Sequence, residues 1–187
     1  KLLWQYAWPS YIILKTPDPV LVEDKILIAD DNDGDIYRRS STLLQIENGV
    51  PSVLWQSPEL YSDVSTPIVI DGYIYGAYGG KYSISRSTSL RCLSLEDGRL
   101  MWKHSEKILG REWISLTCAD GKIIVLEESG KLSVIEASPE AYREISTCVL
   151  QKGEKKYRGF FTTPVLCNGR IYCRGFGGEL VCVDMRS

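Results

Sequence analysis

Several features that define common protein classes are missing from this sequence of 187 residues. No apolar run approaches the roughly 20 residues that a membrane-spanning helix needs. The longest basic run is the pair Lys155-Lys156, and the formal net charge is −2. Because nucleic-acid affinity depends on positive charge that tracks the phosphates, we expect neither a membrane-spanning segment nor a nucleic-acid partner.

Side chains that carry catalysis or bind metals are also scarce. His104 is the only histidine. It follows a predicted outer strand, so a Ser-His-Asp arrangement would have to form around a residue expected at the rim. The six cysteines show neither CxxC spacing nor a histidine partner set, which removes support for a metal or thiol-protease site. We therefore expect no catalytic residues and no metal ligands.

One acidic loop, "DDNDGDIYRR" from Asp30, invites comparison with a calcium-binding EF-hand. With Gly34 at the sixth place, Ala29 stands at the first place, where an oxygen ligand is needed. The twelfth place holds no glutamate. We interpret the loop as a solvated turn.

What the sequence does contain is a repeat. Hydrophobic residues make up 44% of the chain and charged residues 25%, as in ordinary globular proteins. An apolar strand, a short polar turn and a second apolar strand recur about every 48 residues, a period typical of stacked modules. Four segments share this pattern: "DPVLVEDKILIADD" from Asp18, "TPIVIDGYIYGAYGG" from Thr66, "SLTCADGKIIVLEESG" from Ser115 and "TPVLCNGRIYCRGFGG" from Thr163.

The turns identify these segments as β-hairpins. Their central pairs are Glu23-Asp24, Asp71-Gly72, Asp120-Gly121 and Asn168-Gly169, and Asp-Gly and Asn-Gly tolerate the positive φ angles of two-residue hairpin turns. A third strand and a fourth strand follow in each repeat, the fourth running through Trp55, through Trp102 and, less clearly, through "YREISTCVL". Four antiparallel strands per repeat predict an all-β chain of β-propeller blades.

We expect one propeller domain or half-propeller over residues 1–187. Its blades are predicted at about 18–56, 66–104, 114–149 and 162–187. The chain ends on a third strand, and "KLLWQ" matches a fourth strand through Trp4. Residues 1–6 are therefore predicted to close the last blade as its outer strand, because an unpaired edge is an aggregation hazard.

The spacing in "LSLEDGRLMW" resembles the tryptophan-docking motif of the PQQ-like, quinoprotein alcohol dehydrogenase-like β-propeller repeat family. The resemblance covers essentially the whole chain. It implies that Trp4, Trp55, Gly98 and Trp102 dock blades against one another. The third repeat departs from the motif, because "EASPEAYREI" contains no tryptophan.

The family's enzymes carry an adjacent cysteine pair over the cofactor and an acidic base beside calcium, and no adjacent Cys-Cys pair occurs in this chain. The resemblance therefore implies a non-catalytic scaffold that binds a protein or small ligand, similar to the barrel-assembly lipoproteins of bacterial outer membranes. The alternative is a fragment of a PQQ-dependent oxidoreductase, and only that alternative implies PQQ and calcium. Resemblance alone suggests a periplasmic or exported location.

Connections between blades and loops between second and third strands fall on one face of a propeller, where binding usually occurs. Aromatic and charged residues in these connections form the candidate binding face: Trp8, Tyr61, Arg111, Trp113, Tyr157, Arg158 and Phe160. The alternative is that the aromatic side chains fill gaps between blades.

Members of the family generally have eight blades, and four are visible in this sequence. Bare sheet flanks would lose stabilisation comparable to that of a whole domain. Three arrangements cover the flanks: a four-bladed ring, a homodimer that completes a larger ring, or a fragment of a longer chain, and we favour the last two.

The cysteines of the last repeat give one further expectation. If Gly177-Gly178 forms its second hairpin turn, Cys173 faces Cys182. Cross-strand disulfides are usually strained, so two small buried hydrophobic residues are favoured over a bond.

Overall fold

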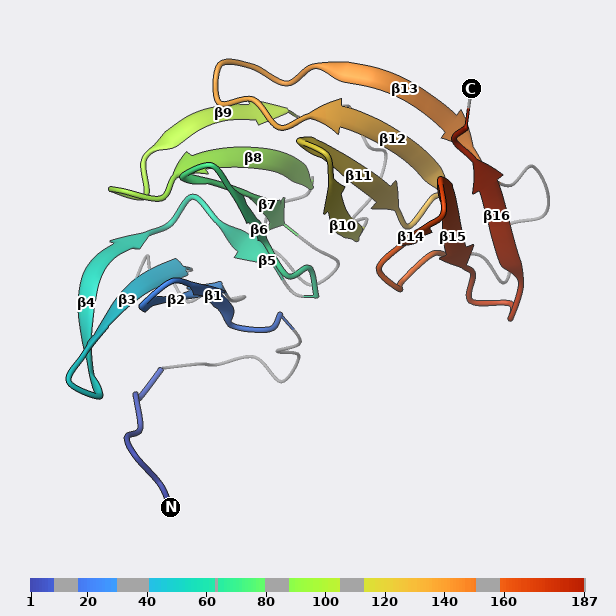
Figure 1. The fold of residues 1–187 in the computed structure, drawn as a ribbon. Helices are drawn as coiled ribbons and strands as arrows, with labels where there is room; N and C mark the ends of the chain where they lie inside the picture. Colours follow the sequence, from blue (N-terminus) through green and yellow to red (C-terminus); the bar gives the residue numbers. More distant parts are fainter. Residues whose placement is uncertain are drawn as a thin grey trace. The chain divides into compact units, whose positions relative to one another are not determined.

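The computed structural model describes residues 1–8, 17–29, 41–62, 64–79, 88–104, 113–150 and 159–186. Sixteen β-strands and no helix are assigned in these residues. They group into two compact units, which we call the N-terminal unit, Lys1–Arg111, and the C-terminal unit, Glu112–Ser187. Figure 1 draws the strands of both units.

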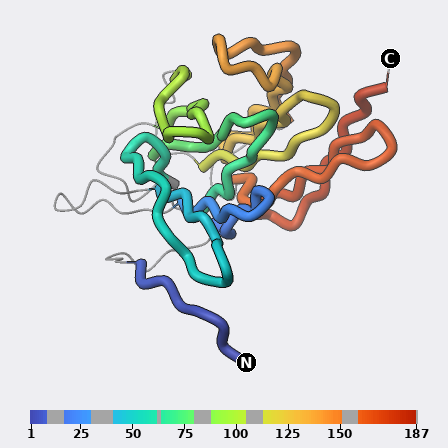
Figure 2. Tube along the Cα trace, turned by 60° about the vertical axis from the view of Figure 1, so that its left-hand side comes forward, coloured from blue at the N-terminus to red at the C-terminus, as the bar shows by residue number. Residues whose placement is uncertain are grey.

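The N-terminal unit begins with a four-stranded antiparallel sheet in the order β1-β2-β3-β4. Its strands are β1 (Val20–Val22), β2 (Lys25–Ala29), β3 (Ser41–Glu47) and β4 (Val50–Ser57). Figure 2 shows the Cα trace of the described residues doubling back between successive strands, most plainly in the red C-terminal part.

The second sheet of this unit repeats the pattern and adds one short strand. Antiparallel pairs join β6 (Ile68–Ile70), β7 (Tyr73–Gly79), β8 (Ser89–Ser94) and β9 (Leu100–His104) in that order. The extra strand, β5 (Tyr61–Ser62), pairs in parallel with the end of β7. The repeat pattern did not predict β5, because two residues are too few to show a periodicity.

The C-terminal unit contains two further antiparallel sheets. The first joins β10 (Ile114–Ala119), β11 (Lys122–Glu127), β12 (Lys131–Glu136) and β13 (Glu144–Val149). The second joins β14 (Val165–Cys167), β15 (Arg170–Arg174) and β16 (Leu180–Asp184). Within the described residues this last sheet has three strands.

Backbone angles confirm the predicted hairpin turns. Asp71 and Gly72 have φ angles of 48° and 80°, and Asp120, Gly121, Asn168 and Gly169 are also positive. Glu23, in the first turn, has a φ of 55°. Together with four successive sheets whose main strands pair antiparallel, these angles confirm the prediction of an all-β chain of antiparallel blades.

A β-bulge marks the same position in three of the four sheets. The register between third and fourth strands shifts after the pairs Leu43↔Trp55, Cys92↔Trp102 and Val134↔Ser146. Trp55, Trp102 and Ser146 therefore occupy equivalent positions, and the missing tryptophan of the third repeat is replaced by a serine.

Each unit has its own apolar core. In the N-terminal unit, Trp55 packs against a buried cluster of Leu27, Ala29, Leu43, Leu60, Ile74 and Leu93. In the C-terminal unit the cluster comprises Ile124, Leu126, Leu132, Val134, Phe160, Ile171 and Cys173. Leu60 and Phe160 come from the connections before the second sheet of their units, so a side chain from each connection packs in the core.

The predicted pairing of Cys173 with Cys182 is wrong by one residue. Cys173 faces Val181, and Cys182 faces Tyr172. A five-residue connection, Gly175–Glu179, replaces the two-residue turn on which the prediction depended. Neighbouring residues of a strand point to opposite faces of the sheet, so Cys182, next to Val181, lies on the other face from Cys173. Cys173 is buried, Cys182 is exposed, and all six cysteines are free.

Residues 1–8 have no assigned strand in the structure. The closure of the last blade by residues 1–6 stays a prediction. The same applies to the expectation of one propeller domain or half-propeller with the stated blade limits.

Candidate binding face

Three aromatic residues from separate segments meet in the C-terminal unit. Trp113 directly precedes β10, Phe161 lies before β14, and Phe176 lies between β15 and β16. The rings of Trp113 and Phe161 have centroids 4.9 Å apart at 74°, and those of Phe161 and Phe176 are 5.9 Å apart at 87°. Such edge-to-face contacts are favourable. We call these three residues the aromatic cluster, and its Phe176 is 66% exposed.

The residue next to this cluster points into the core. Phe160 is 1% exposed, its backbone N–H donates to the Glu128 carbonyl over 3.1 Å, and it forms a β-bridge with Gly175. A Cβ on Gly130, whose φ is +88°, would lie 3.0 Å from the Phe160 ring. The glycine therefore makes room for Phe160, and the extended backbone directs Phe161 to the other side.

In the N-terminal unit, the corresponding connection is held by a half-buried cation. The Arg91 guanidinium lies 3.4 Å from the centre of the Tyr78 ring, pairs with the Glu59 carboxylate and donates to the Glu59 carbonyl over 3.0 Å. Tyr61 packs against Tyr78 with ring centroids 5.6 Å apart. Burial lowers the pKa of Arg91 and Glu59 opposes that shift, but arginine stays charged in proteins. The charge therefore anchors the connection to β7 and β8.

Trp55 and Gly98 make a close contact between the two sheets of the N-terminal unit. The Trp55 Nε1–H donates to the Leu95 carbonyl over 2.8 Å, and a Cβ on Gly98 would lie 2.7 Å from the indole. Ser57 Oγ donates to the Gly98 carbonyl over 2.9 Å. Trp102 is buried, with its ring 6.0 Å from that of Tyr75.

The other predicted site residues are distributed as follows. Tyr61 and Phe160 are buried, which is the gap-filling arrangement that the sequence left open. Trp4 and Trp8 are half-buried in the segment without strands. Four predictions lie outside the described residues: Arg111, Tyr157, Arg158 and the acidic loop from Asp30.

Sequence reasoning missed Phe176, although its signal was available. Phe176 stands in "GFGG", the loop between second and third strands of the last repeat, and such loops share a face with the connections. Among the residues that the structure describes, no group of three His, Cys, Asp or Glu side chains could hold a metal ion. A search of these same residues for an apolar helix of membrane-spanning length finds none.

No protein-family model matches the chain, and no curated protein matches it in sequence. Solved structures do match. The computationally designed Ika8 protein aligns with a TM-score of 0.58 and 9% identity over 89% of this chain and 45% of its own. The quinohemoprotein alcohol dehydrogenase ADHIIG from Pseudomonas putida HK5 aligns with a TM-score of 0.51 and 22% identity over 66% of this chain and 19% of its own. BamB from Moraxella catarrhalis aligns with a TM-score of 0.49 and 13% identity over 90% of this chain and 57% of its own.

At these identities the likenesses show the fold alone. Together with the four repeated antiparallel sheets, they place the chain among β-propellers, with four blades visible. The chain spans less than half the length of the first two structures.

Proposed function

We propose that this chain is a non-catalytic, PQQ-like β-propeller that binds a protein or small ligand through the face bearing its inter-blade connections. The observation that carries the proposal is the aromatic cluster, in which a connection and a second-to-third-strand loop meet and leave Phe176 exposed. Rigid aromatic side chains at the centre of an interface commonly dominate its binding energy.

The supporting contacts fix this face on the sheets. Phe160 and Gly175 bridge the two segments that carry Phe161 and Phe176, so the exposed ring sits on an ordered base. A ring held in place loses little conformational entropy on binding. The Trp55–Gly98 contact supports the docking role that the resemblance implies for these two residues.

Selection from a random peptide library displayed on phage tests the proposal. Selected peptides should lose at least tenfold in affinity for the variant Phe176→Ala, because a hot-spot residue is worth more than about 1.4 kcal/mol. The matched control is Val50→Ala, which removes a similarly exposed apolar side chain from the first residue of β4. Selected peptides whose affinity survives Phe176→Ala would contradict the proposal.

One structural comparison supports a second candidate function. The quinohemoprotein alcohol dehydrogenase shares the fold at 22% identity, so the alternative is that the chain is a piece of a PQQ-dependent oxidoreductase. Titration with PQQ and calcium, followed by absorbance, separates the two. Our proposal predicts no saturable binding, and saturable binding would favour the oxidoreductase.

The outer face of the last sheet supports a further partner. Val165, Leu180 and Cys182 share this face through the cross-strand register and are exposed. We propose that a second copy of the chain covers it and completes a larger ring. Light scattering should then give twice the mass of the 21.1 kDa chain. A strictly monomeric species would exclude the homodimer.

A further inference from the structure

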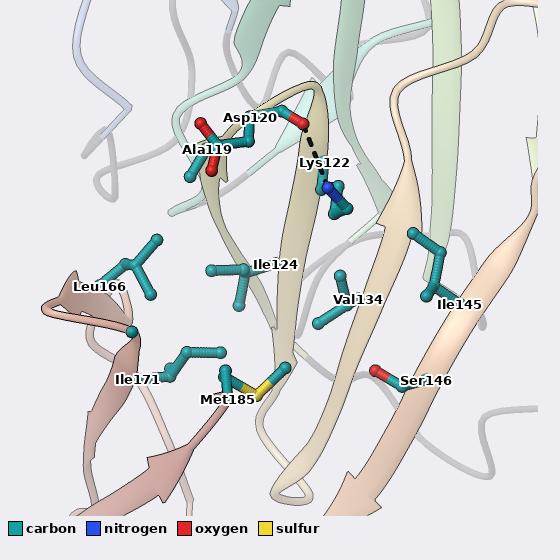
Figure 3. A pocket seen from close by; sticks show the side chains of 11 residues that line it. Ala119, Asp120, Lys122, Ile124, Val134, Ile145, Ser146, Leu166, Ile171 and Met185 are labelled. Carbon is teal, nitrogen blue, oxygen red and sulfur yellow. Dashed lines mark hydrogen bonds between the residues drawn. The ribbon is translucent and has the colours of Figure 1, made fainter. Parts of the chain in front are cut away.

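The two sheets of the C-terminal unit form an open apolar hollow of about 320 Å³, within the size range of small-ligand sites. Three of its lining residues are buried, namely Ile124, Val134 and Ile171, and it is also lined by Ile145 of β13 and by Met185, which follows β16 (Figure 3). Ile145 is 49% exposed and Met185 41% exposed. Exposed apolar side chains gathered around one hollow commonly mark a binding site.

The hollow lies at the opposite end of the strands from the aromatic cluster. It includes Ala119, where β10 ends, and Gly169 in the β14–β15 turn. Trp113 and Phe176 lie near the other ends of β10 and β15. A ligand in the hollow would therefore be additional to the one proposed for the aromatic cluster.

A comparison of equivalent positions in the two units indicates which ligand the hollow can hold. Ser146, on its wall, stands at the position that Trp55 occupies in the N-terminal unit. The acceptor of the Trp55 indole also has a counterpart. Leu95 N–H donates to Gly72 O and Met185 N–H donates to Gly169 O, both over 2.9 Å, so the Met185 carbonyl corresponds to the Leu95 carbonyl that accepts from Trp55.

The N-terminal unit has a hollow at the equivalent place, of about 420 Å³, but its lining differs. It is lined by Leu43, Leu54 and Leu95 together with polar residues such as Asp71 and Glu96. The counterparts of Ile124 and Ile171 are Leu27 and Ile74, which pack with Trp55 in the core cluster. In the C-terminal unit, which has no indole at this position, Ile124 and Ile171 themselves line the hollow.

We infer that this hollow binds a small molecule with a neutral aromatic ring of about indole size that carries one N–H donor. Its apolar lining favours a ring, because burying aromatic surface contributes about 25 cal/mol per Å². Lys122 and Asp120 also line the hollow, and Lys122 Nζ lies 3.4 Å from the Asp120 carbonyl oxygen. Because these two side chains carry opposite charges, they favour a neutral ligand over an ion.

Indole itself is the probe that tests the inference. We expect saturable shifts in the methyl NMR signals of Ile124, Ile145, Ile171 and Met185 when the full chain is titrated with indole. The probe 1-methylindole lacks the N–H donor. Its affinity should be lower than that of indole by a factor of about three or more, as expected for one lost hydrogen bond. Equal affinity for the two probes would overturn the assignment of the Met185 carbonyl.

A variant that fills the hollow separates this site from any other. Ser146→Trp should abolish the indole-induced shifts and raise the midpoint of thermal unfolding. Val149→Trp, at an exposed position on the same strand, should do neither. If Ser146→Trp fails to fold, Ser146→Phe provides a smaller ring for the same measurement.

Three results would overturn the inference. Shifts that persist unchanged in the filled variant would place indole elsewhere. Shifts confined to methyl groups of the N-terminal unit would do the same. Shifts of the hollow's methyl groups that depend on protein concentration without indole would show that a second copy occupies it.

Discussion

Each of the two units contains a pair of sheets with a similar strand order, but different side chains pack the two pairs. In the N-terminal unit Trp55 docks on Gly98, and Leu60 from the connection fills the core beside Gly76. In the C-terminal unit Ser146 takes the tryptophan position, and the larger Phe160 comes from the connection. The large aromatic side chain that packs at the core therefore comes from the fourth strand in the N-terminal unit and from the connection in the C-terminal unit.

The comparison shows which part of the repeat is fixed by the fold. The bulge between third and fourth strands lies at the same register in both units, because the backbone pairing does not depend on the side chain there. The side chain at this position is free to change if another residue supplies the buried surface. The following predictions test whether that exchange is real.

The largest effect is expected at the connection of the C-terminal unit. Phe160→Ala removes a fully buried ring and should lower the free energy of unfolding by about 3–5 kcal/mol, measured by urea denaturation. The matched control is Phe161→Ala, one residue along and half-buried, which should cost clearly less. Equal costs for the two variants would show that the connection does not carry the core.

The next effect is expected at the docking contact of the N-terminal unit. Gly98→Ala places a Cβ 2.7 Å from the Trp55 ring at a φ of +69°, so strain and overpacking together should cost about 2–3 kcal/mol. Gly49→Ala is the control, because its φ of +77° is similar and nothing lies within 4 Å. If both variants lose the same stability in urea, the indole contact contributes nothing beyond backbone strain.

These contrasts also explain what the sequence could predict. Asp71-Gly72 and Asn168-Gly169 identified hairpins because the turn itself requires positive φ angles at those residues. The pairing of Cys173 with Val181 could not be predicted in the same way. The connection Gly175–Glu179 has five residues, and its sequence does not fix the register as a two-residue turn would. Local chemistry determined the turns, and loop length determined the register.

The candidate site was less predictable than the fold. Trp113 and Phe160 were predicted as aromatic residues of connections, but a connection has no periodicity that indicates which side chain faces inward. Phe160 is buried against Gly130, whereas Phe161 joins the aromatic cluster. Which of these two side chains is buried depends on contacts between residues that are distant in sequence, and a single sequence does not show these contacts.

A smaller effect isolates the hydrogen bond of the docked indole. Trp55→Phe keeps an aromatic ring on Gly98 but removes the Nε1–H that donates to Leu95 O. The free energy of unfolding should fall by about 1 kcal/mol, the usual value for one such bond. Trp102→Phe, at the equivalent position of the next blade, provides the comparison by the same measurement. A Trp55→Phe variant as stable as the parent would mean that the ring alone docks the blade.

The smallest perturbation compares the two units through their cysteines. Cys92 is the cysteine of the N-terminal unit and is buried, whereas Cys118, Cys148, Cys167 and Cys182 are exposed in the C-terminal unit. Burial raises the pKa of Cys173 to about 11, so its thiol stays protonated and unreactive at pH 8.

A disulfide reagent such as DTNB should therefore label four thiols quickly at pH 8, all in the C-terminal unit. Cys92 and Cys173 should react only as the protein unfolds, because the thiolate is the reactive form and both sites exclude the reagent. Mass spectrometry of tryptic peptides identifies the labelled residues, and denatured protein provides the control with six labels. Rapid labelling of Cys92 would show that the tryptophan-docked unit opens more readily than the unit without the tryptophan, reversing the order of packing that the two cores suggest.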